Sequence, residues 1–239
     1  ACLNFGVPGY STDQELLLVR DRVWGFDPEV GVLVVYLAND IIGNRREGRL
    51  QGNRAKPRFV AGDDGLVLTN VPVPNVPRPG GVPAWNLSDE VYGRQRVGRR
   101  GGRIMRSALL TRLLRPRNTE PVFDAERVSP DFRSAIDLFK AIVLQLEASC
   151  AEREAPLCLA LLPGKSYVLD PDSFSAEMQE YLRAEIVNWC AQEGISVCDL
   201  ASGLRGLPET ERDRLYFVAD GHLTELGHIR VAELLRACL

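Results

Sequence analysis

Gly31-Val32-Leu33-Val34-Val35-Tyr36-Leu37-Ala38-Asn39-Asp40 is the stretch of sequence that decides the fold. From Gly31 to Ala38 it is continuously apolar, which is typical of a parallel strand buried on both faces. The polar pair Asn39-Asp40 follows at the carboxyl end of this strand, where doubly wound α/β sheets bind their ligands. We therefore expect an α/β fold with a functional site close to Asn39.

Strands and helices alternate on both sides of this stretch. Hydrophobic patterns predict further strands at Cys2–Phe5, Leu157–Leu162 and Ile195–Leu200, and helices from Thr12 onward and at Asp131–Glu152, Ser175–Gln192 and Glu225–Ala237. Thr12 and Glu15 have the spacing of a capping box at the start of the first of these helices. Strands separated by helices form a parallel sheet through right-handed crossovers, with helices on both faces. The 239 residues are expected to form a single domain, 1–239.

A basic segment rich in Pro, Gly and Arg, at about 41–128, interrupts this alternation. Between Ile41 and Glu120 there are sixteen Arg and Lys residues and six Asp and Glu residues, a net charge of +10 in a chain whose net charge is −3. The elements predicted in it are a hairpin over Arg58–Leu68 and a short helix over Ser107–Leu114. We interpret the segment as an insertion beside the site. Its arginines would favour an anionic substrate, but a solvated basic surface without that role fits the composition equally well.

The two histidines of the chain, His222 and His228, both lie near its C-terminus. Asp220 precedes His222 by two residues and follows the apolar run Leu215–Val218, so one loop would present both side chains to the same cavity. An acid that orients a histidine base forms two thirds of a catalytic triad. Taken alone, Asp-x-His is also compatible with a surface histidine beside a helix-capping aspartate.

Several other catalytic motifs are absent from the sequence. There is no G-x-S-x-G, H-E-x-x-H or C-x-x-C, which argues against α/β-hydrolases, zincins and thiol redox enzymes. Gly164-Lys165-Ser166 resembles the end of a phosphate-binding loop, but the glycine required five residues before Gly164 is Leu159. Ser11 is expected to cap a helix rather than act as a nucleophile. The histidines have no third ligand near them in sequence, and we expect neither a metal nor another cofactor.

Three blocks of sequence, in their order and spacing, resemble the SGNH hydrolases, also called the GDSL esterase/lipase family. Asn4–Thr12 resembles the second block of the family, with Gly9 as its glycine, and Leu37–Asp40 resembles the third block, Gly-x-Asn-Asp, with Asn39 as its asparagine. Asp220–His222, followed by Leu223, Thr224 and Gly227, resembles the fifth block. The resemblance spans nearly the whole chain. It implies a three-layer α/β/α, flavodoxin-like sandwich with a parallel sheet in the order 2-1-3-4-5.

The chemistry implied by this resemblance is the hydrolysis of carboxylic esters, acyl or acetyl, through a covalent acyl-serine. His222 would be the general base, and Asp220 would hold its imidazole in the correct tautomer. The Gly9 backbone N–H, the Asn39 side-chain amide and the N–H of the serine itself would form the oxyanion hole. The substrate would be the acyl ester of a small molecule or a carbohydrate, and no cofactor would be needed.

The sequence departs from the family pattern at three points. Leu37 replaces the usual glycine of the third block, and Asp220 lies two rather than three residues before His222. The largest departure is that the first block, Gly-Asp-Ser, which carries the nucleophilic serine, does not occur in residues 1–239. We expect this serine to lie upstream of Ala1, so that the chain as given would be inactive alone.

The first strand of the family fold would be lost together with that serine. It would lie in the middle of the sheet, between the strands predicted at Cys2–Phe5 and Val32–Leu37. Those two strands would then expose unpaired backbone N–H and C=O groups. We expect the isolated chain to be poorly stable or rearranged.

The alternative hypothesis is a non-catalytic module, derived from a hydrolase fold, that binds carbohydrate or another polyanion. The pairing of Asp220 with His222 argues against it, because such a module has no need of the pair. We expect no nucleic-acid partner, because the basic segment has no zinc finger and few aromatic residues. No stretch approaches the ~18 apolar residues of a membrane helix. The six cysteines are expected to be mostly buried free thiols, although a disulfide such as Cys150–Cys158 remains open.

Overall fold

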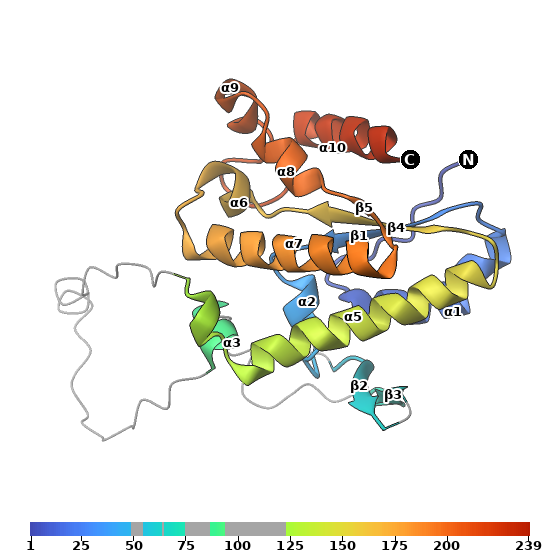
Figure 1. Cartoon of the computed structure of the whole chain (residues 1–239). Helices are drawn as coiled ribbons and strands as arrows, with labels where there is room; N and C mark the ends of the chain where they lie inside the picture. Colours follow the sequence, from blue (N-terminus) through green and yellow to red (C-terminus); the bar gives the residue numbers. More distant parts are fainter. Residues whose placement is uncertain (49–54, 64, 75–86, 94–122) are drawn as a thin grey trace, which may run out of the picture.

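The computed structural model describes residues 1–48, 55–63, 65–74, 87–93 and 123–239 (Figure 1). Strands and helices alternate along most of this length. The helices, with 3₁₀ turns marked η, are α1 (Thr12–Asp21), η1 (Val23–Phe26), α2 (Asp40–Gly43), α3 (Leu87–Tyr92), η2 (Ala125–Arg127), α5 (Pro130–Ala151), α6 (Lys165–Leu169), α7 (Phe174–Glu193), α8 (Leu200–Arg205), α9 (Glu209–Arg212) and α10 (Glu225–Cys238). The strands are β1 (Gly31–Tyr36), β2 (Arg58–Gly62), β3 (Gly65–Thr69), β4 (Leu157–Leu162) and β5 (Ser196–Cys198).

The central sheet consists of three parallel strands in the order β1-β4-β5. Gly31 is paired with Leu157, and Cys158 with Ser196. This order confirms the predicted adjacency of the strand at 31–38 with the strand at 157–162, and of the latter with the strand at 195–200. The first and last of these strands are shorter than predicted, because their ends leave the ladder before the polar residues that follow.

Helices pack on both faces of the sheet, so the chain forms a three-layer α/β/α arrangement (Figure 1). On one face, Leu159 and Leu161 of β4 join the main core, to which α5 and α7 contribute most of their buried side chains. On the other face, Cys158 and Ala160 form a smaller core with the side chains of α8 and α10. The predicted α/β fold class is therefore confirmed.

Local sequence signals set the ends of the two long helices. Ser129 caps α5 by accepting a hydrogen bond from the Phe132 N–H (3.1 Å), and Pro130, which has no N–H to satisfy, occupies the first helical position. Ser173 caps α7 in the same way. Gly194 ends α7 in the left-handed conformation, with a φ of 74°, which favours glycine. None of the described helices combines the length and the hydropathy needed to cross a membrane.

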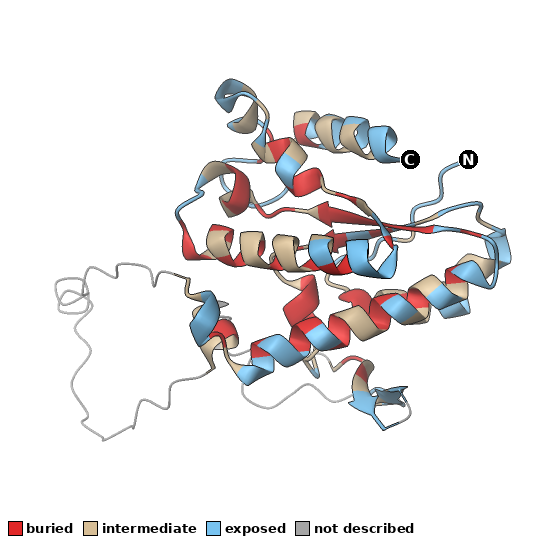
Figure 2. Ribbon diagram, in the orientation of Figure 1, coloured by how far each residue is buried: buried red, intermediate tan, exposed pale blue. Residues whose placement is uncertain are grey.

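Strand β1 is buried on one face only, although its sequence is that of a strand buried on both. Leu33 and Val35 are 7% and 0% exposed, whereas Val32 and Val34, which point to the other face, are 36% and 42% exposed (Figure 2). The Gly31 N–H donates to the Pro156 carbonyl, so the odd-numbered residues of β1 direct their backbone groups at β4. The backbone groups of Val32 and Val34 therefore face away from β4, along an edge that pairs with no described strand and is here called the open edge of β1.

The strand predicted at Cys2–Phe5 does not form, and that prediction is wrong. A strand needs a neighbour to satisfy its backbone groups, and the described residues place none beside this segment. Phe5 instead packs edge-to-face against Phe26, with ring centroids 5.4 Å apart.

The basic segment contains the predicted hairpin. Strands β2 and β3 pair antiparallel from Arg58↔Thr69 to Gly62↔Gly65, one residue beyond the predicted end. Helix α3 was not predicted, and the helix predicted over Ser107–Leu114 lies outside the described residues.

The start of α1 differs from the predicted capping box. Ser11 rather than Thr12 occupies the N-cap position, as expected for Ser11, but its side chain makes no capping hydrogen bond. Ser11, Thr12, Asp13 and Gln14 are all buried, because the first turn of α1 faces the protein interior. Asp13, in this turn, belongs to a buried cluster of carboxylates described below.

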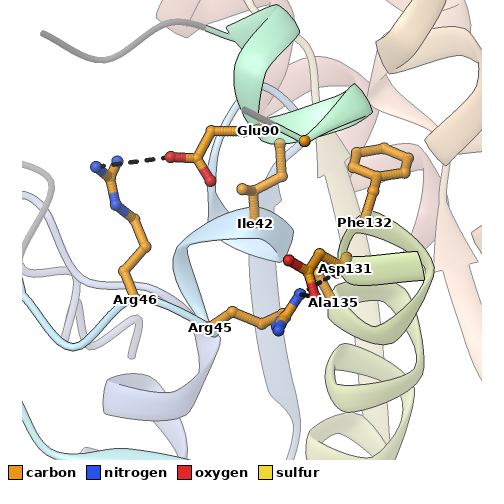
Figure 3. A pocket seen from close by; sticks show the side chains of 8 residues that line it. Ile42, Arg45, Arg46, Glu90, Asp131, Phe132 and Ala135 are labelled. Atoms are coloured by element: carbon orange, nitrogen blue, oxygen red, sulfur yellow. Dashed lines mark hydrogen bonds and ion pairs between the residues drawn. The ribbon is translucent and has the colours of Figure 1, made fainter. Parts of the chain in front are cut away.

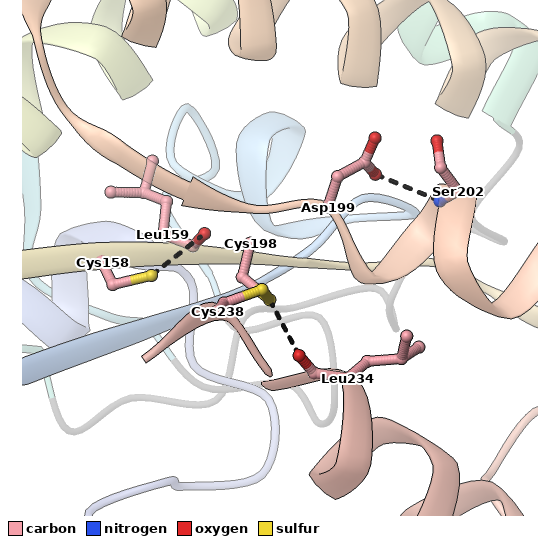
Figure 4. Close-up of a disulfide and its surroundings, with 7 residues drawn as sticks. All are labelled: Cys158, Leu159, Cys198, Asp199, Ser202, Leu234 and Cys238. Carbon is pink, nitrogen blue, oxygen red and sulfur yellow. Dashed lines mark hydrogen bonds between the residues drawn. A yellow bond between two sulfur atoms is a disulfide. The ribbon is translucent and has the colours of Figure 1, made fainter. Parts of the chain in front are cut away.

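One disulfide joins Cys198, at the end of β5, to Cys238 at the end of α10 (Figure 4). The pairing of Cys150 with Cys158 that the sequence left open does not occur, because both are free thiols. The expectation of buried free thiols holds for Cys150, Cys158 and Cys190, whereas Cys2 is exposed.

Candidate functional site

Asn39 lies at the carboxyl end of β1, as the sequence predicts. It is half-buried and occupies the N-cap position of α2, but its side chain makes no capping hydrogen bond. No partner for its amide occurs among the described residues. The amide N–H groups of Asn39 are therefore free to donate to a ligand at this edge of the sheet.

Gly9 lies in a tight turn that leads into α1. The Tyr10 N–H donates to the Val7 carbonyl (3.1 Å), with Pro8 and Gly9 between them. Gly9 has a φ of 76°, which the third position of a type II turn requires and which glycine adopts without strain. Within the described ranges, the backbone N–H of Gly9 makes no hydrogen bond.

Helix α1, which follows the Gly9 turn, packs against α2, which follows Asn39. The Asp13 N–H, in the first turn of α1, donates to Asn44 Oδ1 (2.9 Å) at the end of α2. Asn44 is fully buried, so this contact fixes the start of α1 against α2 inside the protein.

Asp220 and His222 form the pair that the sequence predicts. The His222 Nδ1 lies 3.2 Å from Asp220 Oδ1, and the same oxygen accepts the His222 backbone N–H at 2.8 Å. The N–H of His222 holds the pKa of the Asp220 carboxyl below its ordinary value, so this carboxylate is negatively charged at neutral pH. Both side chains are exposed, by 81% for His222 and 55% for Asp220. Burial of the acid, usual in a complete triad, is not seen here.

The loop that carries this pair lies at the same edge of the sheet as Asn39. Tyr216, just before the loop, donates its hydroxyl proton to the carbonyl of Pro163, which follows β4 (3.0 Å). The next residue, Gly164, lies so close to the end of β1 that an added Cβ would approach the Tyr36 hydroxyl to 3.1 Å and the Ala38 Cβ to 3.3 Å. The ends of β1 and β4 and the loop therefore adjoin one another. Within the described part of the chain, no hydrogen bond links Gly9 or Asn39 directly to the Asp220–His222 pair.

A buried carboxylate cluster, defined by Asp13, Glu15, Asp40 and Lys56, adjoins this edge and was not anticipated from the sequence. Lys56 Nζ donates to Asp13 Oδ2, and the two side chains are only 1% and 0% exposed. Asp40 Oδ2 accepts the Tyr36 N–H (2.7 Å), one of the backbone groups on the open edge of β1.

Burial perturbs every acid of the buried carboxylate cluster in the same direction. It raises the pKa of Asp13 to about 6, although Lys56 opposes the shift. It raises the pKa of Asp40 to about 7 and that of Glu15 to about 8, in each case reinforced by neighbouring carboxylates. The cluster thus holds one lysine, paired with Asp13, and three carboxyl groups, which favours a state in which some of these carboxyl groups hold a proton at neutral pH.

Several buried polar atoms around this cluster have no hydrogen-bond partner in the described structure. They are Thr12 Oγ1, Gln14 Oε1, Glu15 Oε2 and Asn44 Nδ2. The only sequence signal for the cluster is the run of polar residues at the start of α1. Its partner Lys56 lies 43 residues from Asp13, beyond the reach of any local pattern.

A pocket of about 380 Å³ lies between α2, α3 and α5 (Figure 3). It is lined by Ile42, Arg45, Arg46, Glu90, Gly93, Asp131, Phe132 and Ala135. Arg45 pairs with Asp131 (2.9 Å) and Arg46 with Glu90 (3.9 Å), so both guanidinium groups already face a carboxylate. The pocket belongs to the basic segment and to α5, not to the edge of the sheet that carries Asn39.

In the portion of the chain that is described, no three His, Cys, Asp or Glu side chains gather in a way that would hold a metal ion. No family model, no curated protein and no solved structure matches this chain.

Proposed function

We propose that the protein hydrolyses carboxylic esters through an acyl-serine intermediate, with His222 as the general base. The observation that carries this proposal is the Nδ1 to Oδ1 contact of 3.2 Å between His222 and Asp220, in a loop beside the end of β1 that carries Asn39. An imidazole whose Nδ1–H is held by a carboxylate presents Nε2 as a proton acceptor. No described residue forms a hydrogen bond with that Nε2.

The reaction would proceed in two balanced steps. Nε2 of His222 takes the serine proton as the oxygen attacks the ester carbonyl, and then returns it to the departing alcohol. Water then attacks the acyl-serine, losing a proton to His222, and the serine leaves with that proton as the carboxylic acid is released. Asp220 keeps its charge throughout and stabilises the imidazolium.

The negative charge on the carbonyl oxygen would be stabilised by Gly9 and Asn39. Each has an N–H donor without a partner among the described residues, and each directly precedes one of two helices, α1 and α2, that pack against each other. A preorganised donor of this kind lowers the barrier by roughly 3–4 kcal/mol.

The nucleophile would be a serine outside residues 1–239, on a strand that pairs in parallel with the open edge of β1. At that edge, Val32 and Val34 have exposed apolar side chains, and their backbone groups pair with no described strand. Parallel strands end at the same edge of a sheet, so a serine following such a strand would lie beside Asn39.

The test is to assay the full-length natural polypeptide with p-nitrophenyl acetate and to label it with a fluorophosphonate, which reacts with activated serines. We expect hydrolysis, with the label on a single serine outside residues 1–239. His222→Ala should abolish both the hydrolysis and the labelling. Asn39→Ala should lower kcat by roughly 10²–10³-fold. His228→Ala is the matched control and should leave both unchanged. Full activity in His222→Ala refutes the proposal.

Binding of an anionic carbohydrate is the second candidate function, and it would use the pocket with Arg45 and Arg46, whose guanidinium groups would exchange Asp131 and Glu90 for the ligand. Its test is calorimetric titration of the full-length polypeptide with oligogalacturonate. Saturable binding that Arg45→Ala and Arg46→Ala weaken, in a protein that hydrolyses no ester, would support this function over catalysis. Binding that persists unchanged in both variants would contradict it.

A further inference from the structure

Lys165 holds the loop that carries Asp220 and His222. Its ammonium donates to the backbone carbonyls of Phe217 (2.7 Å), Val218 (2.9 Å) and Asp220 (3.4 Å). An ammonium group has three N–H donors, so these three carbonyls use its whole capacity. The Gly164-Lys165-Ser166 motif, which lacks the first glycine of a phosphate-binding loop, here directs its lysine at backbone carbonyls of the protein.

The loop has little else to hold its shape. Its ends are joined by the bridge between Tyr216 and Leu223 and by the hydrogen bond from the Phe217 N–H to the His222 carbonyl (3.0 Å). Between these ends the side chains contribute little packing, since Phe217 is 53% and Val218 is 94% exposed. Three carbonyl dipoles that converge on one point repel each other unless a cation lies between them.

The support beneath Lys165 is rigid. Its neighbour Gly164 donates its N–H to Oε1 of the fully buried Gln179 (2.6 Å). Lys165 itself begins α6, directly after β4 and Pro163, whose carbonyl accepts the Tyr216 hydroxyl. The ammonium is therefore presented to the loop from a backbone segment that is anchored to the buried Gln179.

We propose that Lys165 is a positioning residue that fixes the Asp220–His222 pair in its hydrogen-bonded geometry. Asp220 connects Lys165 to His222, because its backbone carbonyl accepts a hydrogen bond from Lys165 and its carboxylate contacts the His222 imidazole. The catalytic consequence rests on the proposed ester hydrolysis, whereas the conformational role stands independently of it.

The experiment compares Lys165→Met, Lys165→Arg and Lys165→Ala with the wild type, all in the full-length polypeptide. The first readout is the hydrogen exchange of the Phe217 and His222 amides, together with the NMR signals of the His222 imidazole, which are assigned as the signals absent from His222→Ala. We expect exchange at both amides to accelerate at least tenfold in Lys165→Met. Lys140→Met, which removes a lysine paired with Glu185 elsewhere, is the control and should change neither amide.

The second readout is ester hydrolysis. We expect kcat to fall by about 10–100-fold in Lys165→Met with KM nearly unchanged, because a displaced base slows the chemical step and leaves substrate binding intact. Lys165→Arg should retain part of the activity, and n-propylammonium, which replaces the missing side-chain atoms, should restore kcat in Lys165→Ala.

The two proposals fail in different ways. Amide exchange and imidazole signals that stay at wild-type values in Lys165→Met overturn the role of Lys165, as does a wild-type kcat in a protein that hydrolyses esters. Accelerated exchange in a protein without esterase activity supports the role of Lys165 and refutes the ester hydrolysis.

Discussion

Replacing Lys56 by methionine tests the buried carboxylate cluster most directly. Methionine has a similar length but no charge, so the substitution leaves the Asp13 carboxylate without its partner at a site where both side chains are at most 1% exposed. Removing one member of a buried ion pair costs about 3–5 kcal/mol. For a chain of this size, about 2–4 °C of melting temperature correspond to 1 kcal/mol, so the expected fall is roughly 6–20 °C.

The cost should depend on pH. The attraction of Lys56 opposes the rise in the pKa of Asp13, which is already about 6. Without the lysine that pKa rises further, and Asp13 can escape its unpaired charge by binding a proton. Lys56→Met should therefore destabilise the protein less at pH 5 than at pH 8. The double variant Lys56→Met/Asp13→Leu, which removes both charges, should recover most of the loss.

The measurement is urea denaturation of each variant at pH 5 and pH 8, followed by tryptophan fluorescence. Lys140→Met is the control, because the Lys140–Glu185 pair is partly exposed and such pairs contribute at most about 1 kcal/mol. If Lys56→Met does not fold at pH 8, the double variant and the data at pH 5 still give the comparison. Equal stabilities of Lys56→Met and Lys140→Met at both pH values would refute the reasoning.

Three further predictions concern other parts of the fold. The pKa of Glu15 is raised from 4.5 to about 8, so its contribution to stability is complete below pH 4.5 and is lost as the pH rises through 8. Glu15→Gln should remove this loss of unfolding free energy, which is on the order of 4 kcal/mol between pH 4 and 9. Urea titrations in which the unfolding free energy of Glu15→Gln varies with pH as in the wild type would contradict this prediction. Opening the Cys198–Cys238 disulfide with Cys238→Ser should cost about 3–4 kcal/mol, given the separation of 40 residues, and Cys150→Ser should serve as a thiol control in thermal melts. Val34→Thr, on the open face of β1, should change stability by less than about 0.5 kcal/mol, whereas Val35→Thr buries a hydroxyl and should cost about 2 kcal/mol. Equal effects of the two substitutions in denaturation experiments would show that both faces of β1 are covered.

The elements that the sequence predicts well are those whose signals are local. Periodic apolar residues placed α5 and α7 within a residue or two, and the apolar run Leu157–Leu162 coincides with β4. The Asp220–His222 contact was also predictable, because only one residue separates the two side chains.

The features that escaped prediction depend on contacts between distant residues. Nothing near Lys56 in sequence indicates that its ammonium reaches Asp13, and no spacing rule pairs Cys198 with Cys238 among six cysteines. The strand expected at Cys2–Phe5 failed for the same reason, since a strand forms only where a neighbour completes its backbone hydrogen bonds. Lys165 was noted only as part of the rejected phosphate-loop motif. Its contact with the Asp220–His222 loop, more than 50 residues away, has no local sequence signal.

Because β1 has an open edge, the concentration of the protein decides which strand pairs with that edge. Val32 and Val34 present a template that any extended segment can join. Pairing with a strand of the same polypeptide is a first-order event, independent of concentration, whereas pairing with a strand of another molecule is second-order and gains with every increase in concentration. Dilution during refolding therefore favours the intramolecular partner, and crowding favours polymers.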